Sequence, residues 1–73
     1  MKLRECVPGT KVRVVGRDVR KVFPKVRKQT ARIVFVDKKF DEFPVFIKFK
    51  QGIHTATKSG RTIYVRPDEI ELA

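Results

Sequence analysis

The feature that most constrains the fold is a set of short segments in which apolar and polar residues alternate. The alternation is clear at residues 11–15 and 44–50, and Ala31–Val36 is rich in β-branched and aromatic residues. A period of two residues is typical of β-strands with one buried face. Thr62–Val65 indicates a fourth strand and Ile70–Leu72 a short fifth. We therefore expect an all-β protein.

The length of the chain limits how these strands can pack. Seventy-three residues leave room for one small domain, 1–73, because short chains bury little of their surface. Two packed sheets of ordinary size need more strands, so we expect a single sheet bent into a small five-stranded antiparallel barrel. Helix-forming patterns are weak, and the one helical feature we expect is a 3-10 turn at residues 67–70, before the last strand.

Strand alternation also selects the core. The residues that we expect to face inward are Val12, Val14, Ile33, Val45, Ile47, Phe49, Val65 and Ile70. Their neighbours along the strands then face outward, among them Lys11, Arg13, Phe46, Lys48 and Lys50.

The order of these elements resembles the SH3-like barrels. The residues that carry the resemblance are PGTKVRVV at 8–15, a long loop, a strand ending at Val36, a hairpin into residues 44–49, and DEIEL at 68–72. Within that group, FPVFIKF at 43–49 and DEI at 68–70 are most similar to the electron-transport accessory barrels, which include the ferredoxin-docking subunit of photosystem I. The resemblance implies a barrel with a 3-10 turn before its last strand and no shared catalytic motif.

The whole chain has a formal net charge of +10 at pH 7, and the positive charge is concentrated in its first half. Residues 1–36 hold eleven Lys and Arg against two acidic residues, whereas residues 37–73 hold seven against six. The densest stretch, RDVRKVFPKVRK at 17–28, contains six bases and one acid. We expect this long connection to be exposed and to bind a polyanion.

The candidate binding residues combine the bases of this connection with outward-facing strand residues and the loop at 51–61. They are Arg13, Arg17, Arg20, Lys21, Lys25, Arg27, Lys28, Phe46, Lys48, Lys50, Lys58 and Arg61. Phe46 among lysines pairs a ring on which a base can stack with cations that neutralise phosphates. Packing over an end of the barrel or under a loop is the alternative for Phe46, and the sequence leaves both open. For Phe23 we expect packing onto the barrel.

Residues suited to catalysis or metal binding are sparse. Cys6 is the single Cys and His54 the single His, so the sequence indicates neither an internal disulfide nor a metal site. We expect Cys6 to act as a small apolar residue and His54 to make ordinary hydrogen bonds. No segment approaches the ~20 apolar residues that span a bilayer, so we expect a cytoplasmic protein without cofactor or membrane contact.

These observations favour a non-enzymatic module that binds nucleic acid through phosphate contacts with limited sequence preference. The alternative is a docking module for an acidic protein, which the resemblance to the ferredoxin-docking barrels implies, although this chain carries more Lys and Arg in its first loop. A third interpretation is enzymatic, because TIY at 62–64 is similar to the active-site strand of type II dihydrofolate reductases, although Thr62 stands where that family has Gln. DNA and RNA stay equally open, as does the oligomeric state.

Overall fold

The computed structural model describes residues 1–39, 42–55 and 60–73. One antiparallel sheet contains all the strands, β1 Lys11–Val14, β2 Ala31–Val36, β3 Val45–Phe49, β4 Thr62–Val65 and β5 Ile70–Leu72. Each of the five predicted strands is present, and no boundary differs by more than one residue. The all-β class is therefore confirmed.

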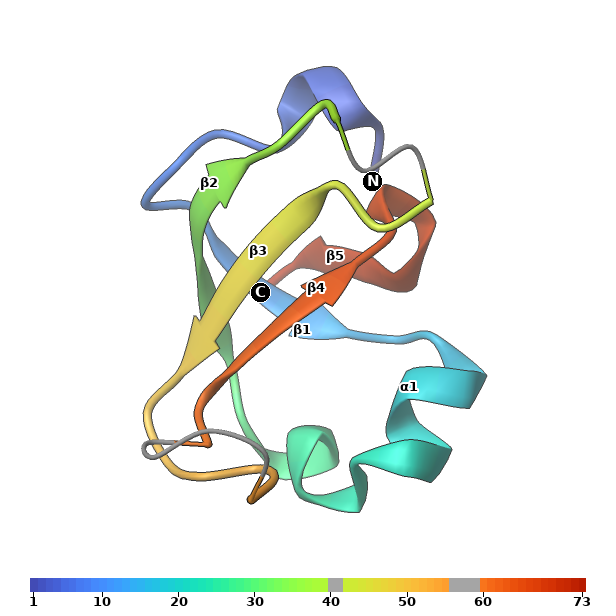
Figure 1. Ribbon diagram of the computed structural model, residues 1–73, viewed down its shortest axis with the longest axis vertical. Helices are drawn as coiled ribbons and strands as arrows, with labels where there is room; N and C mark the ends of the chain where they lie inside the picture. The colour runs from blue at the N-terminus through green and yellow to red at the C-terminus, as the bar shows by residue number, and fades with distance from the viewer. Residues whose placement is uncertain (40–41, 56–59) are drawn as a thin grey trace.

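The sheet is strongly bent, with β3 and β4 in front and β1 and β5 behind in Figure 1. The strand order is β4-β3-β2-β1-β5, so β4 and β5 are edges that do not pair with each other. The sheet is thus barrel-like but open, where we had expected it to close on itself. A 3-10 turn, η3 Pro67–Glu69, links the two edge strands at the predicted position.

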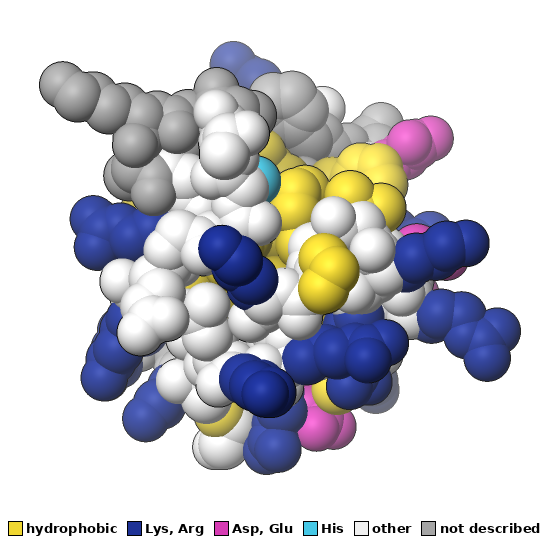
Figure 2. Space-filling model, turned by 90° about the horizontal axis from the view of Figure 1, so that it is seen from below, with side chains coloured by type: hydrophobic (Ala, Val, Ile, Leu, Met, Phe, Trp, Pro, Cys, Tyr) yellow, Lys and Arg dark blue, Asp and Glu magenta, His cyan; other side chains and the backbone are white. Residues whose placement is uncertain are grey.

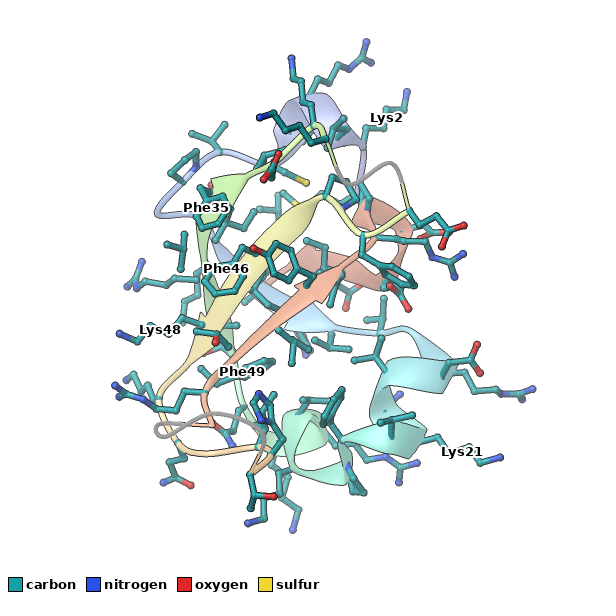
Figure 3. All side chains as sticks on the ribbon, in the orientation of Figure 1. Lys2, Lys21, Phe35, Phe46, Lys48 and Phe49 are labelled. Carbon is teal, nitrogen blue, oxygen red and sulfur yellow. The ribbon has the colours of Figure 1, made fainter. Side chains whose placement is uncertain are left out.

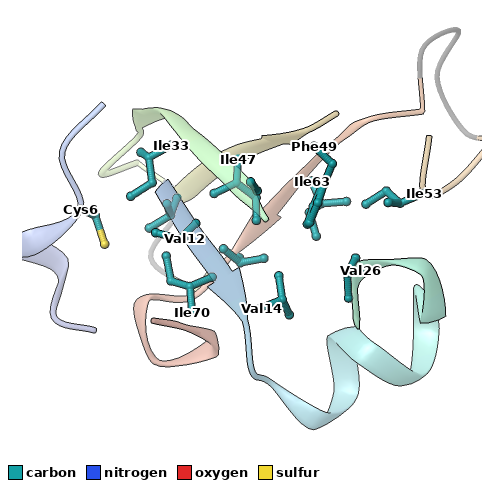
Figure 4. Packing of buried hydrophobic residues seen from close by; sticks show 13 residues of the cluster. Cys6, Val12, Val14, Val26, Ile33, Ile47, Phe49, Ile53, Ile63 and Ile70 are labelled. Carbon is teal, nitrogen blue, oxygen red and sulfur yellow. The ribbon is translucent and has the colours of Figure 1, made fainter. Parts of the chain in front are cut away.

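The inner side of the sheet encloses one hydrophobic cluster (Figure 4). All eight predicted core residues belong to it, and each is at most 2% exposed. The cluster also contains residues outside that prediction, namely Cys6, Val26, Ala31, Ile53 and Ile63. Cys6 follows the short helix η1 (Leu3–Glu5) and Val26 belongs to η2 (Pro24–Lys28), and they lie at opposite ends of the cluster. Different helical segments therefore cover the two ends of the core.

The expectation of a single 3-10 turn was wrong for the N-terminal segment, which contains η1, and for the connection between β1 and β2. An α-helix, α1, spans Arg17–Val22 and is followed directly by η2. Val19 and Phe23 are four residues apart, so both pack against the core from one side of the helix. Pro24 then begins η2, since proline lacks the N–H that would continue α1. The predicted packing of Phe23 onto the barrel is confirmed.

An irregularity in β2 decides which of its side chains face outward. The pairing with β3 is regular up to Ile33 and shifts by one residue before Phe35. Ile33 is buried, but Val34 and Phe35 are 41% and 37% exposed. Simple alternation would turn Phe35 inward, whereas the bulge turns it outward and lets Val36 pack against the core.

The helical segments in the described part of the chain are all short. The longest is α1, with six residues. None of the helices in residues 1–39, 42–55 and 60–73 has the length and apolar character that a membrane crossing requires.

Candidate functional site

Three cationic side chains lie directly opposite one another on the outer face of the sheet. Lys11 of β1 is opposite Arg32 of β2, and Arg32 is opposite Lys48 of β3. All three residues are exposed. Directly opposed residues in an antiparallel pair have Cβ atoms roughly 4.5–5.5 Å apart. We call Lys11, Arg32 and Lys48 the cation row.

The cation row is unfavourable for the isolated fold, because like charges placed directly opposite destabilise a sheet. Ion pairs among the described residues involve only the guanidinium groups of Arg13 and Arg66. No described carboxylate therefore pairs with the row. Arg32 donates from Nη1 to the carbonyl oxygen of Gly9 (3.0 Å), which orients its guanidinium and leaves its charge unchanged. The row is a line of positive charge without an ion pair to any described carboxylate.

The positive surface extends from the cation row toward η2 through three adjoining hollows of about 290, 700 and 350 Å³. All three share Thr30, and no described acidic residue lines any of them. The cationic residues that line them are Lys11, Arg13, Lys25, Arg27, Lys28, Arg32, Lys48, Lys50 and Arg61. We call these nine residues the basic surface. Figure 2 shows Lys and Arg side chains outnumbering acidic ones at the end of the molecule formed by α1 and η2.

The basic surface brings together seven of the twelve predicted binding residues, which are Arg13, Lys25, Arg27, Lys28, Lys48, Lys50 and Arg61. Arg13 also forms an ion pair with Glu71 (3.7 Å), so its charge is partly compensated. Lys58 lies outside the described residues.

The remaining predicted cations lie on α1 and line none of the three hollows. Because Val19 and Phe23 hold one side of the helix against the core, Arg17 and Lys21 project from the other side. Arg20 is half-buried, and its Nε atom is inaccessible and has no hydrogen-bond partner. Figure 3 shows Lys21 and Lys48 on opposite sides of the molecule. The densest charge in the sequence is thus divided in space.

Two members of the cation row, Lys11 and Arg32, were not among the predicted binding residues. The alternation pattern already turned Lys11 outward, and Arg32 lies between buried Ala31 and Ile33. A signal for exposure was therefore present in both strands. The missing information was the pairing register, which places both side chains beside Lys48.

A row of three aromatic rings lies on the same face of the sheet. Phe35 is opposite Phe46, and Phe46 is opposite Tyr64. The ring centroid of Phe46 lies 4.9 Å from that of Phe35, with an angle of 25° between the two ring planes. It lies 4.7 Å from the ring centroid of Tyr64. Figure 3 shows Phe35, Phe46 and Lys48 along one side of the sheet. We call Phe35, Phe46 and Tyr64 the aromatic row.

The aromatic row changes the interpretation of Phe46. Its ring is half-buried between Phe35 and Tyr64, which are 37% and 41% exposed and present the more accessible rings. Neither residue was among the predicted binding residues, although Tyr64 belongs to the TIY segment of the enzymatic interpretation. Tyr64 follows from alternation with buried Ile63 and Val65, but the orientation of Phe35 depends on the bulge in β2, which has no sequence signal that we recognised.

His54 and Cys6 have structural surroundings. The Nε2–H group of His54 donates to the carbonyl oxygen of Thr62 (2.7 Å), and its ring packs against Phe23 with centroids 5.6 Å apart. Cys6 is a free, buried thiol, and burial raises its pKa, so the thiol is protonated at neutral pH. Within the described residues, no three His, Cys, Asp or Glu side chains are grouped so that they could hold a metal ion.

No family model, curated protein or solved structure matches this chain. The features of the molecule that bear on function are therefore the cation row, the basic surface and the aromatic row.

Proposed function

We propose that this protein is a non-enzymatic nucleic-acid-binding module that contacts the phosphate backbone with limited sequence preference. The observation that carries the proposal is the cation row, in which three like charges face one another across β1, β2 and β3. Such an arrangement costs stability in the free protein. A polyanionic partner relieves that repulsion on binding, which gives the row a physical reason to exist.

The layout of the basic surface favours a regular polyanion. Its cations come from β1, β2, β3 and η2, together with Lys50 after β3 and Arg61 before β4, and they extend from the sheet to the end of the molecule. Neighbouring strands place the members of the row ~4.8 Å apart. A nucleic-acid strand carries one phosphate on every nucleotide, so a linear series of phosphates can meet a linear series of cations. An acidic protein presents its carboxylates with no such repeat.

We further propose that the module belongs to the SH3-like barrels. The support is the bent five-stranded antiparallel sheet, the long connection after β1 and the 3-10 turn before β5. The resemblance to the ferredoxin-docking barrels supplies the alternative function, in which the same basic surface receives an acidic protein.

Titration of labelled DNA and RNA oligonucleotides, followed by fluorescence anisotropy across a salt series, tests the proposal. The logarithm of the binding constant should fall linearly with the logarithm of salt concentration, with a slope of about −0.7 to −0.9 for each of ~4 to 6 phosphate contacts. A labelled acidic protein titrated in the same buffers is the control. Absence of binding to DNA and RNA at low salt would overturn the proposal, and tight binding to the acidic protein alone would favour docking.

A further inference from the structure

We infer that the aromatic row stacks against unpaired bases, so that the preferred partner is a single strand of nucleic acid. This inference deepens the proposed function and rests on it, because the cation row has to hold the phosphate backbone while the rings contact bases. The observation that carries it is the presence of both rows on one face of the same strands.

The separation of the two rows suits a nucleotide. Along β3, Phe46 lies two residues before Lys48, and both belong to the same outer face. Two residues of a strand span roughly 6.6 Å, which is comparable to the reach of a nucleotide from its phosphate to its base. A strand of nucleic acid that crosses β1, β2 and β3 can therefore place phosphates on the cation row and turn its bases toward the aromatic row.

The rings are also held in place before a ligand arrives. Phe35 and Tyr64 remain 37% and 41% exposed, and each packs against Phe46. Packing of this kind restricts their rotamers in the free protein, so little side-chain entropy is lost on binding. Every base has a π-face, so stacking on such rings tolerates any sequence. The row thus adds affinity without adding sequence preference.

A duplex cannot use the aromatic row in this way. Its bases are stacked in pairs inside the helix, so the groups that reach a protein face are phosphates and the edges of bases. Duplex binding would then depend on the cations alone. The contribution of Phe35 and Tyr64 should appear only when bases are unpaired, and this difference makes the inference measurable.

The test compares a single-stranded oligothymidine with an abasic strand of the same length and charge, using anisotropy at one salt concentration. Stacking on an aromatic side chain is worth roughly 5- to 140-fold in affinity per base, so the oligothymidine should bind at least about fivefold more tightly. Phe35→Leu and Tyr64→Leu should each reduce this ratio toward one and leave affinity for the abasic strand unchanged. Tyr64→Phe keeps the ring and should keep the ratio.

The chain offers a matched control in Phe43, an exposed ring (42%) whose centroid lies 5.9 Å from the guanidinium carbon of Arg66. Phe43 is outside the aromatic row, so Phe43→Leu should leave the ratio of the two affinities unchanged. Thermal unfolding followed by circular dichroism establishes that every variant is folded at the temperature of the titration. A ratio that falls equally in Phe43→Leu and Tyr64→Leu would contradict the assignment of stacking to the row.

Tyr64 supplies a second readout, because the sequence contains one Tyr and no Trp. Intrinsic fluorescence therefore reports on Tyr64, and it should be quenched by oligothymidine and not by the abasic strand. Equal affinities for the two strands with unchanged fluorescence would overturn the inference and leave the proposed function standing. Binding to neither strand would remove the proposed function itself. A wild-type dimer that Tyr64→Leu converts to a monomer in sedimentation would assign the row to self-association and overturn the inference.

Discussion

The outer face of the sheet and the helix α1 both carry cations, but only the sheet aligns them. The cation row takes one residue from each of three strands that are distant in sequence, and strand pairing brings Lys11, Arg32 and Lys48 into line. On α1, Arg17 and Lys21 are close in sequence yet lie on the exposed side of the helix, because the other side packs on the core. Charge density along a chain is therefore a poor measure of charge density in space.

The segment after α1 behaves differently from α1 itself. Pro24 begins η2, and the three cations of η2, Lys25, Arg27 and Lys28, line the hollows beside the sheet. The basic stretch of the sequence is thus divided at Pro24 into a half that faces away from the sheet and a half that extends the basic surface. Variants that change the charges of each part separately test whether the two parts differ in binding.

The largest difference is expected from paired charge reversals. Arg32→Glu with Lys48→Glu should weaken nucleic-acid binding at least about a hundredfold, because hydrogen bonds to charged groups contribute ~1.5–3 kcal/mol each. Arg17→Glu with Lys21→Glu makes the same change in net charge and should cost only a few-fold, through long-range attraction. Anisotropy titrations measure both. Similar losses of affinity in the two double variants would show that net charge decides binding and that the position of the charges in the cation row does not matter.

The next difference concerns stability. Ile47→Ala, at a site with 0% exposure under the sheet, should lower the free energy of unfolding by about 2–4 kcal/mol. Val22→Ala, at a site on α1 that is 67% exposed, should change it by at most about 0.5 kcal/mol. Urea denaturation followed by circular dichroism gives both values. A large loss at Val22 would mean that α1 has a partner surface beyond its contact with the core.

A smaller effect tests the division at Pro24. Lys28→Gln should reduce the slope of the salt dependence by about one phosphate contact, since Lys28 lines two of the hollows. Lys21→Gln removes the same charge from α1 and should leave the slope unchanged. The salt series described for the wild-type protein provides the measurement. If the slope falls equally in both variants, α1 and η2 belong to one binding segment. If it is unchanged in both, neither Lys28 nor Lys21 contacts a phosphate.

The smallest effect has the opposite sign. Lys48→Gln should raise the free energy of unfolding by ~0.2–1 kcal/mol, because it removes a like charge that faces Arg32. Lys21→Gln is again the control and should leave stability nearly unchanged. Added salt should stabilise the wild-type protein more than Lys48→Gln, since screening weakens a repulsion that the variant lacks. A loss of stability in Lys48→Gln would mean that the row is not under electrostatic strain.

The elements that depend on local periodicity were predictable from the sequence. The five strands and the eight core residues follow from alternation and from runs of β-branched and aromatic residues, which are properties of a few consecutive residues. Pairing register was not predictable, because it is decided by contacts between strands. The sequence analysis therefore oriented Lys11 and Lys48 correctly but could not show that Arg32 lies between them.

Two other features were missed for a related reason. The helix α1 has six residues, too few for a strong periodic signal in the sequence. Packing of Val19 and Phe23 against the core stabilises it. The outward orientation of Phe35 depends on a bulge that forms only when β2 pairs with β3. The course of the β1–β2 connection and the orientation of Phe35 thus depend on tertiary contacts that no short stretch of sequence specifies.

The bulge in β2 reverses which residues of the strand, odd-numbered or even-numbered, face the core. Up to Ile33 the odd-numbered residues face the core, and after Val34 the even-numbered Val36 does. Loss of one residue at this point would restore a regular ladder and keep Phe35 outside, whereas loss of two would turn Val36 outward. Natural variation in the length of this strand should therefore obey a parity rule, in which a single-residue deletion is tolerated better than a double one.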